Sequence, residues 1–204
     1  GWVGKHTNII NPKAGSYFFL GEIYTDLPLT PVTHVVADHC GTCDACIRAC
    51  PTGAIVAPYE LDARLCISYL TIELDGPIPE SLRPLIGNRI YGCDDCQLVC
   101  PWNRFAPLST EMGFRSGRHL DSPMLIELFD WDESTFLRNL EGSPIRRIGH
   151  LRWLRNLAVA LGNAPGGPDI TDSLTARQSH PSGLVREHVE WALRRHVDTG
   201  APLR

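Results

Sequence analysis

The 204-residue sequence predicts an α+β chain in which a cysteine-rich module separates a glycine- and aromatic-rich opening from a helical C-terminal part. Three observations predict this organisation. Seven of the eight cysteines fall in two short runs, at residues 40–50 and 93–100. The opening segment has the composition of strands with glycine turns. After Trp102 the apolar residues recur at helical spacing, with Ser-Pro and Gly signals at the expected helix ends.

Composition and charge limit the classes of protein. The formal charge is −4, but residues 143–204 carry nine arginines against five acidic residues. An arginine-weighted segment suits a polyanion, and a solvated helix surface explains the same excess. No apolar run approaches the roughly 18 residues that span a membrane, and no secretory signal opens the chain. We therefore expect a cytoplasmic protein with no membrane partner. Because the chain begins at Gly1 as if within a domain, we also expect an upstream part.

The two cysteine runs admit three kinds of chemistry. Disulfides require partners farther apart in sequence and an oxidising compartment, so they are disfavoured. Two zinc sites with four thiolates each would use every cysteine. The run "CGTCDACIRACP", however, has the spacing Cys-x2-Cys-x2-Cys-x3-Cys-Pro, which is typical of ferredoxins with two [4Fe–4S] clusters. A tight loop of this kind delivers three thiolates to three corners of one cubane, while the fourth cysteine points to the neighbouring cluster. The spacing therefore favours iron–sulfur clusters over zinc.

The same crossing rule assigns every thiol to a cluster. The first three cysteines of the first run hold the first cluster, and Cys50 crosses to the second. In the second run, Cys93 and Cys96 hold the second cluster, and Cys100 crosses back to the first. The expected third position of the second run is Ile90, which cannot ligate iron, so the solitary Cys66 fills it. The predicted sets are Cys40/Cys43/Cys46/Cys100 and Cys50/Cys66/Cys93/Cys96.

The segments around the cysteines carry weaker signals. The stretch "SYFFLGEIYT" predicts a strand, with Gly15 before it and Gly21 within it. These glycines suit a backbone that lies against a flat ligand, although an ordinary core strand with glycine turns has the same composition. "CISYLTIEL" predicts a helix or a strand. Ser68, Asp94 and Asp95 are polar residues beside the cysteines, where they serve either as cofactor contacts or in loop hydrogen bonds.

The C-terminal part predicts several helices. One begins near Ser122–Pro123, and the clearest has Ser143 as its N-cap, Pro144 at its first position and Gly162 as its stop. "SGLVREHVEWALRRH" predicts another amphipathic helix, and "APGGPDITDSLTARQSHPSG" before it predicts a loop. The stretches "LAVALGN" and "VEWALRR" echo each other about thirty-two residues apart, which indicates pairs of HEAT-type helices.

Five blocks of the sequence together resemble the epoxyqueuosine reductase family. They are collinear and cover nearly the whole chain: "GWVGKHTNIINPKAGSYFFLGEI", "CGTCDACIRACPTGAIV", "LDARLCISYLTIEL", "IGNRIYGCDDCQLVCPWN" and "SPIRRIGHLRWLRNLAVALGN". The resemblance implies an oxidoreductase that reduces epoxyqueuosine to queuosine in tRNA. Electrons would pass through two [4Fe–4S] clusters to cobalamin. The ligand sets above agree with the cluster ligation of this family.

The resemblance also implies a domain order and cofactor contacts. Residues 1–36 would end an α/β cobalamin-binding domain, residues 37–108 would form the ferredoxin-like domain with two clusters, and residues 109–204 would form an α-helical HEAT-like domain. The corrin contacts that it implies are Ile10, Ser16, Gly21, Glu22, Ser68, Asp94 and Asp95. No residue of this chain is assigned as the catalytic acid, because the proton-donating Asp of the family lies upstream of the "GW-x-GK" block.

Partners follow from the same resemblance. The expected macromolecular partner is the anticodon stem-loop of a tRNA that bears epoxyqueuosine. A separate electron donor is expected to reduce the protein, which is expected to be a monomer. Basic helices could grip the stem phosphates, and the candidates are Arg146, Arg147, Arg152 and Arg155. Two alternatives remain open. One is a two-cluster electron-transfer module of another redox complex, and the other is a corrinoid enzyme similar to reductive dehalogenases.

Overall fold

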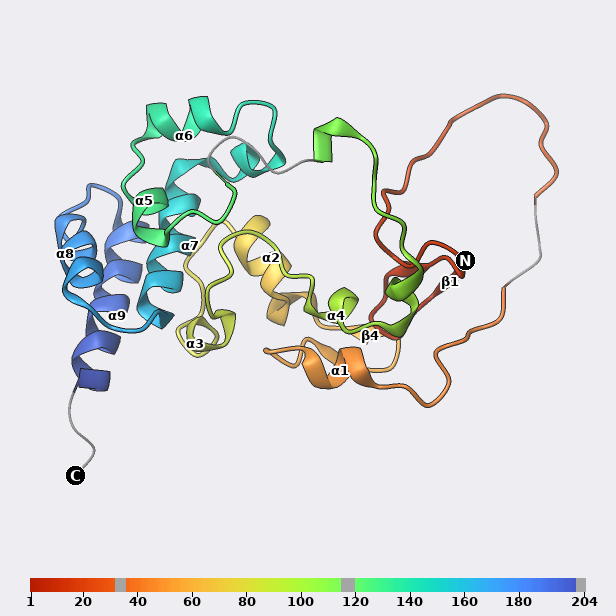
Figure 1. Cartoon of the computed structure of the whole chain (residues 1–204), viewed down its shortest axis with the longest axis horizontal. Coiled ribbons are helices and arrows are strands. Elements are labelled where there is room, and N and C mark those ends of the chain that lie inside the picture. The colour runs from red at the N-terminus through yellow and green to blue at the C-terminus, as the bar shows by residue number, and fades with distance from the viewer. Residues whose placement is uncertain (32–35, 115–119, 201–204) are drawn as a thin grey trace. The chain divides into compact units, whose positions relative to one another are not determined.

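The computed structural model describes residues 1–31, 36–114 and 120–200 (Figure 1). Contacts within the chain divide it into two compact units. Unit 1 consists of Gly1–Ala63 and Asp94–Thr110, and unit 2 consists of Arg64–Cys93 and Glu111–Arg204. None of the helices in the described ranges combines the length and the apolar composition that a membrane span requires. The three-domain division expected from the resemblance stays a prediction, because these units group the chain differently.

Unit 1 is built from short elements. Its strands pair as two antiparallel hairpins, and in the first of them Trp2 lies opposite Ile10. The elements are β1 (Trp2–Val3), β2 (Ile9–Ile10), α1 (Ala45–Ala49), β3 (Ile55–Ala57), β4 (Glu60–Leu61), α4 (Asp95–Leu98) and the 3-10 helix η2 (Pro101–Phe105). Contacts join α1 to α4 and to β3, so the part of the second cysteine run that begins at Asp94 lies beside the first run within this unit.

The strand predicted at residues 16–25 is wrong. Residues 17–31 form no strand, because no described strand lies beside them to pair with their backbone groups. Phe19, Ile23 and Tyr24 are each more than 80% exposed. Gly15, just before this segment, adopts φ +70°, and a Cβ there would lie 2.2 Å from Asn103 Oδ1. Gly15 is therefore required for close contact with the end of the second cysteine run.

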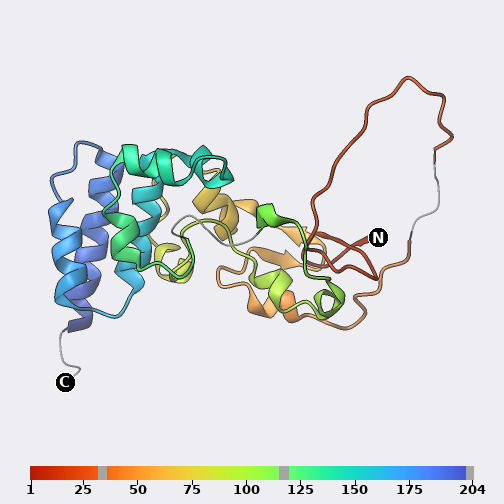
Figure 2. The same cartoon turned by 45° about the horizontal axis from the view of Figure 1, so that its top comes forward.

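Unit 2 is helical. Its elements are α2 (Ile67–Ile72), α3 (Arg83–Ile86), the 3-10 helix η3 (Met112–Phe114), α5 (Leu125–Phe129), α6 (Glu133–Asn139), the 3-10 helix η4 (Pro144–Ile148), α7 (Gly149–Asn163), α8 (Pro168–Ala176) and α9 (Gly183–Gly200). The short 3-10 helix η1 (Ala63–Leu65) spans the boundary between the units in sequence. Helices α7, α8 and α9 lie side by side in both cartoon views (Figures 1 and 2). The core centres on α7, where residues 153–162 are all buried.

Helix α7 differs in two details from its prediction. Ser143 does act as a cap, since its Oγ accepts a hydrogen bond from Ile145 N at 3.3 Å, but it caps η4. The α-helix begins only at Gly149, whose φ of +74° separates the two helices. Gly162 lies inside α7 and does not stop it. A Cβ at Gly162 would lie 2.7 Å from the ring of Trp191 and 2.9 Å from Cα of Ala192, so this glycine permits close packing of α7 against α9.

The loop predicted before α9 is also wrong over residues 168–176, which form α8. Pro168 occupies the first turn of α8, Leu174 is fully buried, and the half-buried Ile170 also packs against the core, so two apolar side chains dock this short helix. The helix predicted from Ser122–Pro123 becomes two helices. Ser122 has a positive φ, and α6 starts from a new cap, because Asp132 Oδ1 accepts a hydrogen bond from Thr135 N at 2.7 Å.

His188 of α9 is a fully buried histidine that makes two hydrogen bonds. Its Nε2 accepts from Ile78 N at 3.1 Å, and its Nδ1 donates to Leu184 O at 2.7 Å. Burial, with a smaller contribution from the nearby Arg83, lowers the pKa of His188 to about 4. The folded state therefore holds the neutral ring.

We expect unit 2 to lose stability as the pH falls from about 6.5 toward 4, because the unfolded chain then binds a proton that folded His188 excludes. The full loss is about 3 kcal/mol, reached below pH 4. Urea unfolding followed by tryptophan fluorescence at several pH values measures it. His188→Gln should flatten this pH dependence, and His150→Gln should leave it in place. An unchanged slope in His188→Gln would contradict the assignment.

Candidate metal centre

The first cysteine run forms a loop followed by one short helix. Gly41 adopts φ +53°, which lets the chain turn between Cys40 and Cys43, and Cys43 N donates to Cys40 O at 3.1 Å. Helix α1 then carries Cys46, and it ends at Cys50 with an extended conformation before the proline. The turn therefore places the first three thiols close together, and the end of the helix at Cys50 lets the chain leave in an extended conformation.

Four cysteines from the two runs line one cavity in unit 1. The cavity measures about 240 Å³, and its cysteines are Cys40, Cys43, Cys46 and Cys100. These are the four that the crossing rule assigns to the first cluster. Burial raises the pKa of the Cys46 thiol, and the neighbouring thiolates of Cys100 and Cys40 raise it further. Thiolates that lie close together repel one another, so the arrangement fits a site in which metal ions bind all of them.

The opening hairpin supplies positive charge and N–H donors to the same cavity. Lys5 Nζ donates to Gly41 O at 2.6 Å and to Cys43 O at 2.9 Å, and it thereby ties the hairpin to the cysteine loop. Burial raises the pKa of the Cys40 thiol, although N–H groups of Lys5 and Trp2 lower it in part. Arg104 also lines the cavity. This surrounding favours thiolates and an anionic cluster.

The second run repeats the design of the first. Gly92 has φ +75°, and Asp94 is the N-cap residue of α4, just as Asp44 is of α1. Helix α4 carries Cys96, whose Sγ lies 4.0 Å from Asn8 Nδ2 of the hairpin. The sequence echo between the two runs is therefore also a structural repeat.

In unit 2, Cys66 and Cys93 are attached to one scaffold. Cys66 is the N-cap residue of α2, and Thr71 at the other end of that helix accepts a hydrogen bond at its Oγ1 from Gly92 N at 2.9 Å. Asn156 of α7 donates to Thr71 O at 2.8 Å and to Ile90 O at 2.9 Å. Two side chains thus fix α2 against the segment that leads to Cys93.

Hydrogen bonds within its own loop favour the metal-binding form of Cys50. Its Sγ accepts a hydrogen bond from Ala54 N at 3.2 Å, and it lies 3.8 Å from Thr52 Oγ1. Burial acts to raise the pKa of Cys50, but these donors outweigh it and the pKa is lowered. The loop therefore stabilises the thiolate form, which is the form that binds metal.

A single zinc ion would require its thiolate ligands to lie close together. Thiolates on one tetrahedral zinc, with Zn–S bonds of about 2.3 Å, must lie within about 4 Å of one another. Within residues 1–31, 36–114 and 120–200, no three Cys, His, Asp or Glu side chains are placed to hold a single metal ion. The preference for a polynuclear cluster over zinc therefore rests on the spacing of the cysteines along the chain.

The predicted corrin contacts lie in different surroundings. Ile10 is fully buried in the hairpin, and the Ser16 hydroxyl is occupied by bonds with Asn103 and Gln97. Gly21 is exposed, and Glu22 is exposed and accepts a hydrogen bond from Tyr24. Ser68 and Asp95 are half-buried, and Asp94 is exposed. The structure ties Ser16 to the end of the second cysteine run, and the assignment of the whole set to a corrin stays a prediction.

The four candidate arginines are not equivalent. Arg155 as a phosphate contact is wrong, because its side chain is fully buried and donates to Leu70 O, Leu74 O and Gly76 O at 2.5–2.8 Å. Arg152 is mostly covered and pairs with Asp75 at 2.9 Å. Arg146 and Arg147 remain exposed. Helical spacing alone did not reveal that α7 is buried on nearly all sides.

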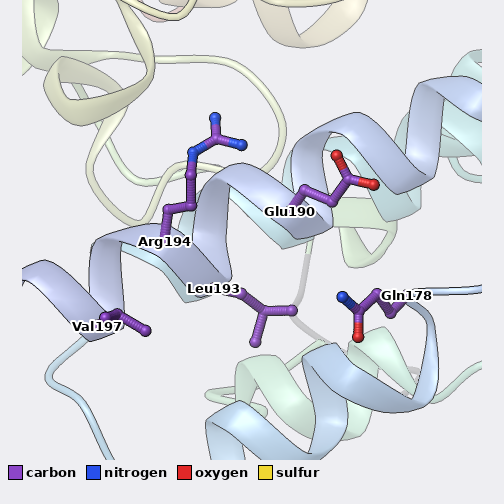
Figure 3. A pocket seen from close by; sticks show the side chains of 5 residues that line it. All are labelled: Gln178, Glu190, Leu193, Arg194 and Val197. Atoms are coloured by element: carbon purple, nitrogen blue, oxygen red, sulfur yellow. The ribbon is translucent and has the colours of Figure 1, made fainter.

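A hollow of about 370 Å³ lies elsewhere in unit 2, on α9 and the end of α8. Its lining is Gln178, Glu190, Leu193, Arg194 and Val197. Figure 3 shows Leu193 and Gln178 extending toward the space between the two segments, while Arg194 points to the other side of α9. Arg194 pairs with Glu80 at 3.3 Å. The lining of the hollow contains none of the eight cysteines, so this hollow is separate from the proposed cluster sites.

Sequence reasoning missed the residues of the hairpin that face the first cavity. His6 lines it, Lys5 binds its loop, and Trp2 packs edge-on against the rings of His39 and Trp102 at 5.0 and 4.8 Å. The available signal was the polar run "GKHTN" between two short apolar pairs, which predicts a hairpin tip. Nothing in that pattern shows that the tip covers a cysteine loop nearly forty residues away.

Comparison with known proteins agrees with this site. Residues 39–103 match the family model described as "4Fe-4S double cluster binding domain". The chain is 60% identical over 199 residues to the epoxyqueuosine reductase of Pseudomonas aeruginosa, covering 98% of this chain and 55% of the relative. It is also 60% identical to that of Escherichia coli K12, covering 97% and 52%. The chain thus spans about half the length of the curated relatives it matches.

Solved structures give the same result. The epoxyqueuosine reductase of Bacillus subtilis superimposes with a TM-score of 0.84 at 32% identity, covering 96% of this chain and 52% of that one. A structure of epoxyqueuosine reductase with an epoxyqueuosine-modified tRNA-Tyr stem loop matches with a TM-score of 0.78 at 27% identity, covering 97% and 60%. Residues 39–103 thus belong to the 4Fe-4S double cluster binding domain family, and nearly the whole chain is similar to about half the length of these epoxyqueuosine reductases.

Proposed function

We propose that this chain carries the electron-transfer part of an enzyme that reduces epoxyqueuosine to queuosine in tRNA. The observation that carries the proposal is the convergence of Cys40, Cys43, Cys46 and Cys100 on one cavity, inside a region matched by a double-cluster domain. Removing the epoxide oxygen as water consumes two electrons and two protons and leaves an alkene. Two one-electron centres in series suit that demand, and the identity of about 60% to epoxyqueuosine reductases supports the choice of substrate.

Two ligand sets follow. The first is Cys40, Cys43, Cys46 and Cys100, supported by the shared cavity. The second is Cys50, Cys66, Cys93 and Cys96, proposed from the order and spacing of the thiols along the chain. The common scaffold of Cys66 and Cys93 and the stabilised thiolate of Cys50 support the second set.

Cobalamin is the proposed acceptor of the electrons, and when bound it would supply strongly reducing chemistry for the removal of the epoxide oxygen. The exposed apolar segment at residues 17–29 offers this chain's contact surface, with Gly21 and Glu22 accessible on it. Ile10 and Ser16 would contribute indirectly, because they hold the hairpin and the start of that segment in place. Ser68, Asp94 and Asp95 complete the proposed set. Lys5 holds the cysteine loop closed beneath the hairpin.

The helical part of unit 2 is the proposed tRNA-binding part. The packed pair α7 and α9, which carries the two echoing sequence stretches, supports a HEAT-like repeat. Arg146 and Arg147 in η4 are exposed, and Arg147 pairs with Glu73 at 2.8 Å, a pair that phosphate could displace. These two arginines are the proposed phosphate contacts.

The test of the function uses the protein that contains this chain, loaded anaerobically with iron, sulfide and cobalamin. It is incubated with a low-potential reductant and an anticodon stem-loop that bears epoxyqueuosine, and the nucleosides are analysed by mass spectrometry. We expect the modified nucleoside to lose one oxygen atom. If the nucleoside stayed unchanged while other redox partners reduced and reoxidised the clusters, the chain would instead be a general electron-transfer module.

Replacing both Arg146 and Arg147 with Ala should weaken stem-loop binding by about tenfold, because two phosphate contacts and the counterions that they release are lost. The slope of log Kd against log salt should fall by roughly 1.5. Fluorescence anisotropy over a series of salt concentrations measures both quantities. Arg194→Ala, a comparably exposed arginine on α9, is the matched control and should change neither. An unchanged slope in the double variant would remove these arginines from the interface.

A further inference from the structure

The ring of His6 is held at the tip of the opening hairpin with one nitrogen occupied. Only 3% of the residue is exposed, and His6 Nδ1 accepts a hydrogen bond from Asn8 N at 3.1 Å. An acceptor at Nδ1 places the proton of the neutral ring on Nε2. Burial lowers the pKa of His6 below its ordinary value, which favours the neutral ring. The tautomer is therefore fixed by the fold of the hairpin.

The position of the ring is fixed by the backbone on both sides. Thr7 adopts φ +67°, and Thr7 N donates to Gly4 O at 2.8 Å, which closes the tight turn that carries His6. A Cβ at Gly4 would lie 3.0 Å from His6 Cε1 and 2.6 Å from Ile10 Cδ1. The glycine leaves room for the ring, and the turn aims it.

The other nitrogen, Nε2, is buried and has no hydrogen-bond partner among the described residues. A buried N–H without an acceptor is destabilising, so such groups in folded proteins nearly always have a partner. His6 lines the cavity of about 240 Å³ together with Cys40, Cys43, Cys46 and Cys100. An acceptor inside that cavity would satisfy the N–H, and sulfur is the acceptor that the proposed cluster supplies.

We propose that His6 Nε2–H donates a hydrogen bond to a sulfur of the first cluster and thereby raises the reduction potential of that cluster. The proposal rests on the proposed function, since it needs the cluster held by the first ligand set. A hydrogen bond to sulfur stabilises the reduced cluster more than the oxidised one, because the reduced cluster carries one more negative charge. His6 is thus a positioning residue that tunes electron transfer without touching the substrate.

The test compares three variants of the reconstituted protein in a redox titration followed by EPR. His6→Phe keeps a ring of similar shape and removes the N–H, so one of the two reduction steps should shift. At a fixed potential the ratio of reduced to oxidised cluster should fall about tenfold, which is about 59 mV for one electron. His6→Gln returns an N–H at similar reach and should restore the ratio to within about threefold. His39→Phe makes the same chemical change at an exposed histidine of the same cavity and should shift neither step.

A second readout keeps the test decisive if His6→Phe fails to hold iron. In the reduced parent protein with ¹⁵N-labelled histidine, pulsed EPR should detect one histidine nitrogen and one exchangeable proton coupled to the cluster spin. The same signals should persist in His39→Phe. Their absence from the iron-loaded parent protein would overturn the proposal, and so would an iron-loaded His6→Phe variant with both reduction steps unshifted. Neither of these results would affect the proposed function, whereas an iron-free parent protein would remove both.

Discussion

Replacing Arg155 with Met is expected to lower the free energy of unfolding of unit 2 by about 3–5 kcal/mol. The guanidinium is fully buried and donates to the carbonyls of Leu70, Leu74 and Gly76, and its Nε donates to Asn156 Oδ1. Burial, with a smaller contribution from Arg152, lowers the pKa of Arg155 to about 10, so it remains charged at neutral pH. Methionine fills similar volume but leaves three carbonyl oxygens without donors.

Urea unfolding of the purified variants measures this effect, with the midpoint expected to fall and the slope to stay constant. Arg155→Lys keeps the charge but cannot reach several carbonyls at once, so it should recover only part of the loss. Arg147→Met is the matched control, because this arginine is 67% exposed and its ion pair contributes little. A loss below about 1 kcal/mol for Arg155→Met would show that the buried guanidinium is not what holds α2 and α7 together.

The same substitution should affect the proposed second cluster. Arg155 binds Leu70 O in α2, and the neighbouring Asn156 binds Thr71 O and Ile90 O, so α7 braces the elements that carry Cys66 and Cys93. Loosening this brace is expected to lower iron retention in Arg155→Met under dilute chelator while Arg147→Met retains its iron. If both variants retained the same amount of iron, cluster binding would not depend on the stability that Arg155 gives to unit 2.

Pairs of cysteine substitutions are expected to lose iron in a pattern that reveals which thiols share a cluster. Cys40→Ala and Cys100→Ala should each lose about four of about eight iron atoms, because each removes a ligand of the first cluster. The double variant Cys40→Ala/Cys100→Ala should lose no more than either single variant, since both thiols serve the same cluster. The double variant Cys40→Ala/Cys93→Ala should lose nearly all of the iron.

Iron and acid-labile sulfide analysis after anaerobic reconstitution measures the pattern, with circular dichroism to verify that each variant is folded. Cys100 lies in the second run, so without crossing it would behave like Cys93. If Cys40→Ala/Cys100→Ala lost all of the iron and Cys93→Ala/Cys100→Ala only about half, each run would hold its own cluster. The shared cavity of Cys40, Cys43, Cys46 and Cys100 predicts the opposite result.

The strong, short-range signals in the sequence predicted the main features of the site. The spacing of the first cysteine run and the crossing rule assigned Cys100 to the distant loop, and the structure brings it to that loop's cavity. The stretch "SGLVREHVEWALRRH" was predicted to be an amphipathic helix, and α9 has Val185, Val189 and Ala192 fully buried and Leu193 half-buried. These features follow from periodicity and spacing, which depend on local geometry.

The remaining features depend on tertiary contacts. "SYFFLGEIYT" has the composition of a strand, but a strand also needs a paired neighbour, which composition does not reveal. Gly162 has the usual character of a helix stop, yet its use is to let Trp191 approach α7. Arg155 looks like a surface arginine in sequence, and only the carbonyls at the end of α2 explain its burial. His6 and Lys5 acquire their roles because the hairpin folds over a loop that is distant in sequence.

The claim on which all of this depends is that the eight cysteines bind two [4Fe–4S] clusters. Mössbauer spectroscopy of the anaerobically prepared, ⁵⁷Fe-labelled chain, with iron, sulfide and zinc measured on the same sample, tests it most directly. We expect about eight iron and about eight sulfide per chain, with the spectrum of [4Fe–4S] clusters and negligible zinc. A colourless protein with about two zinc and no sulfide would contradict the cluster assignment and, with it, the proposed electron transfer to the substrate.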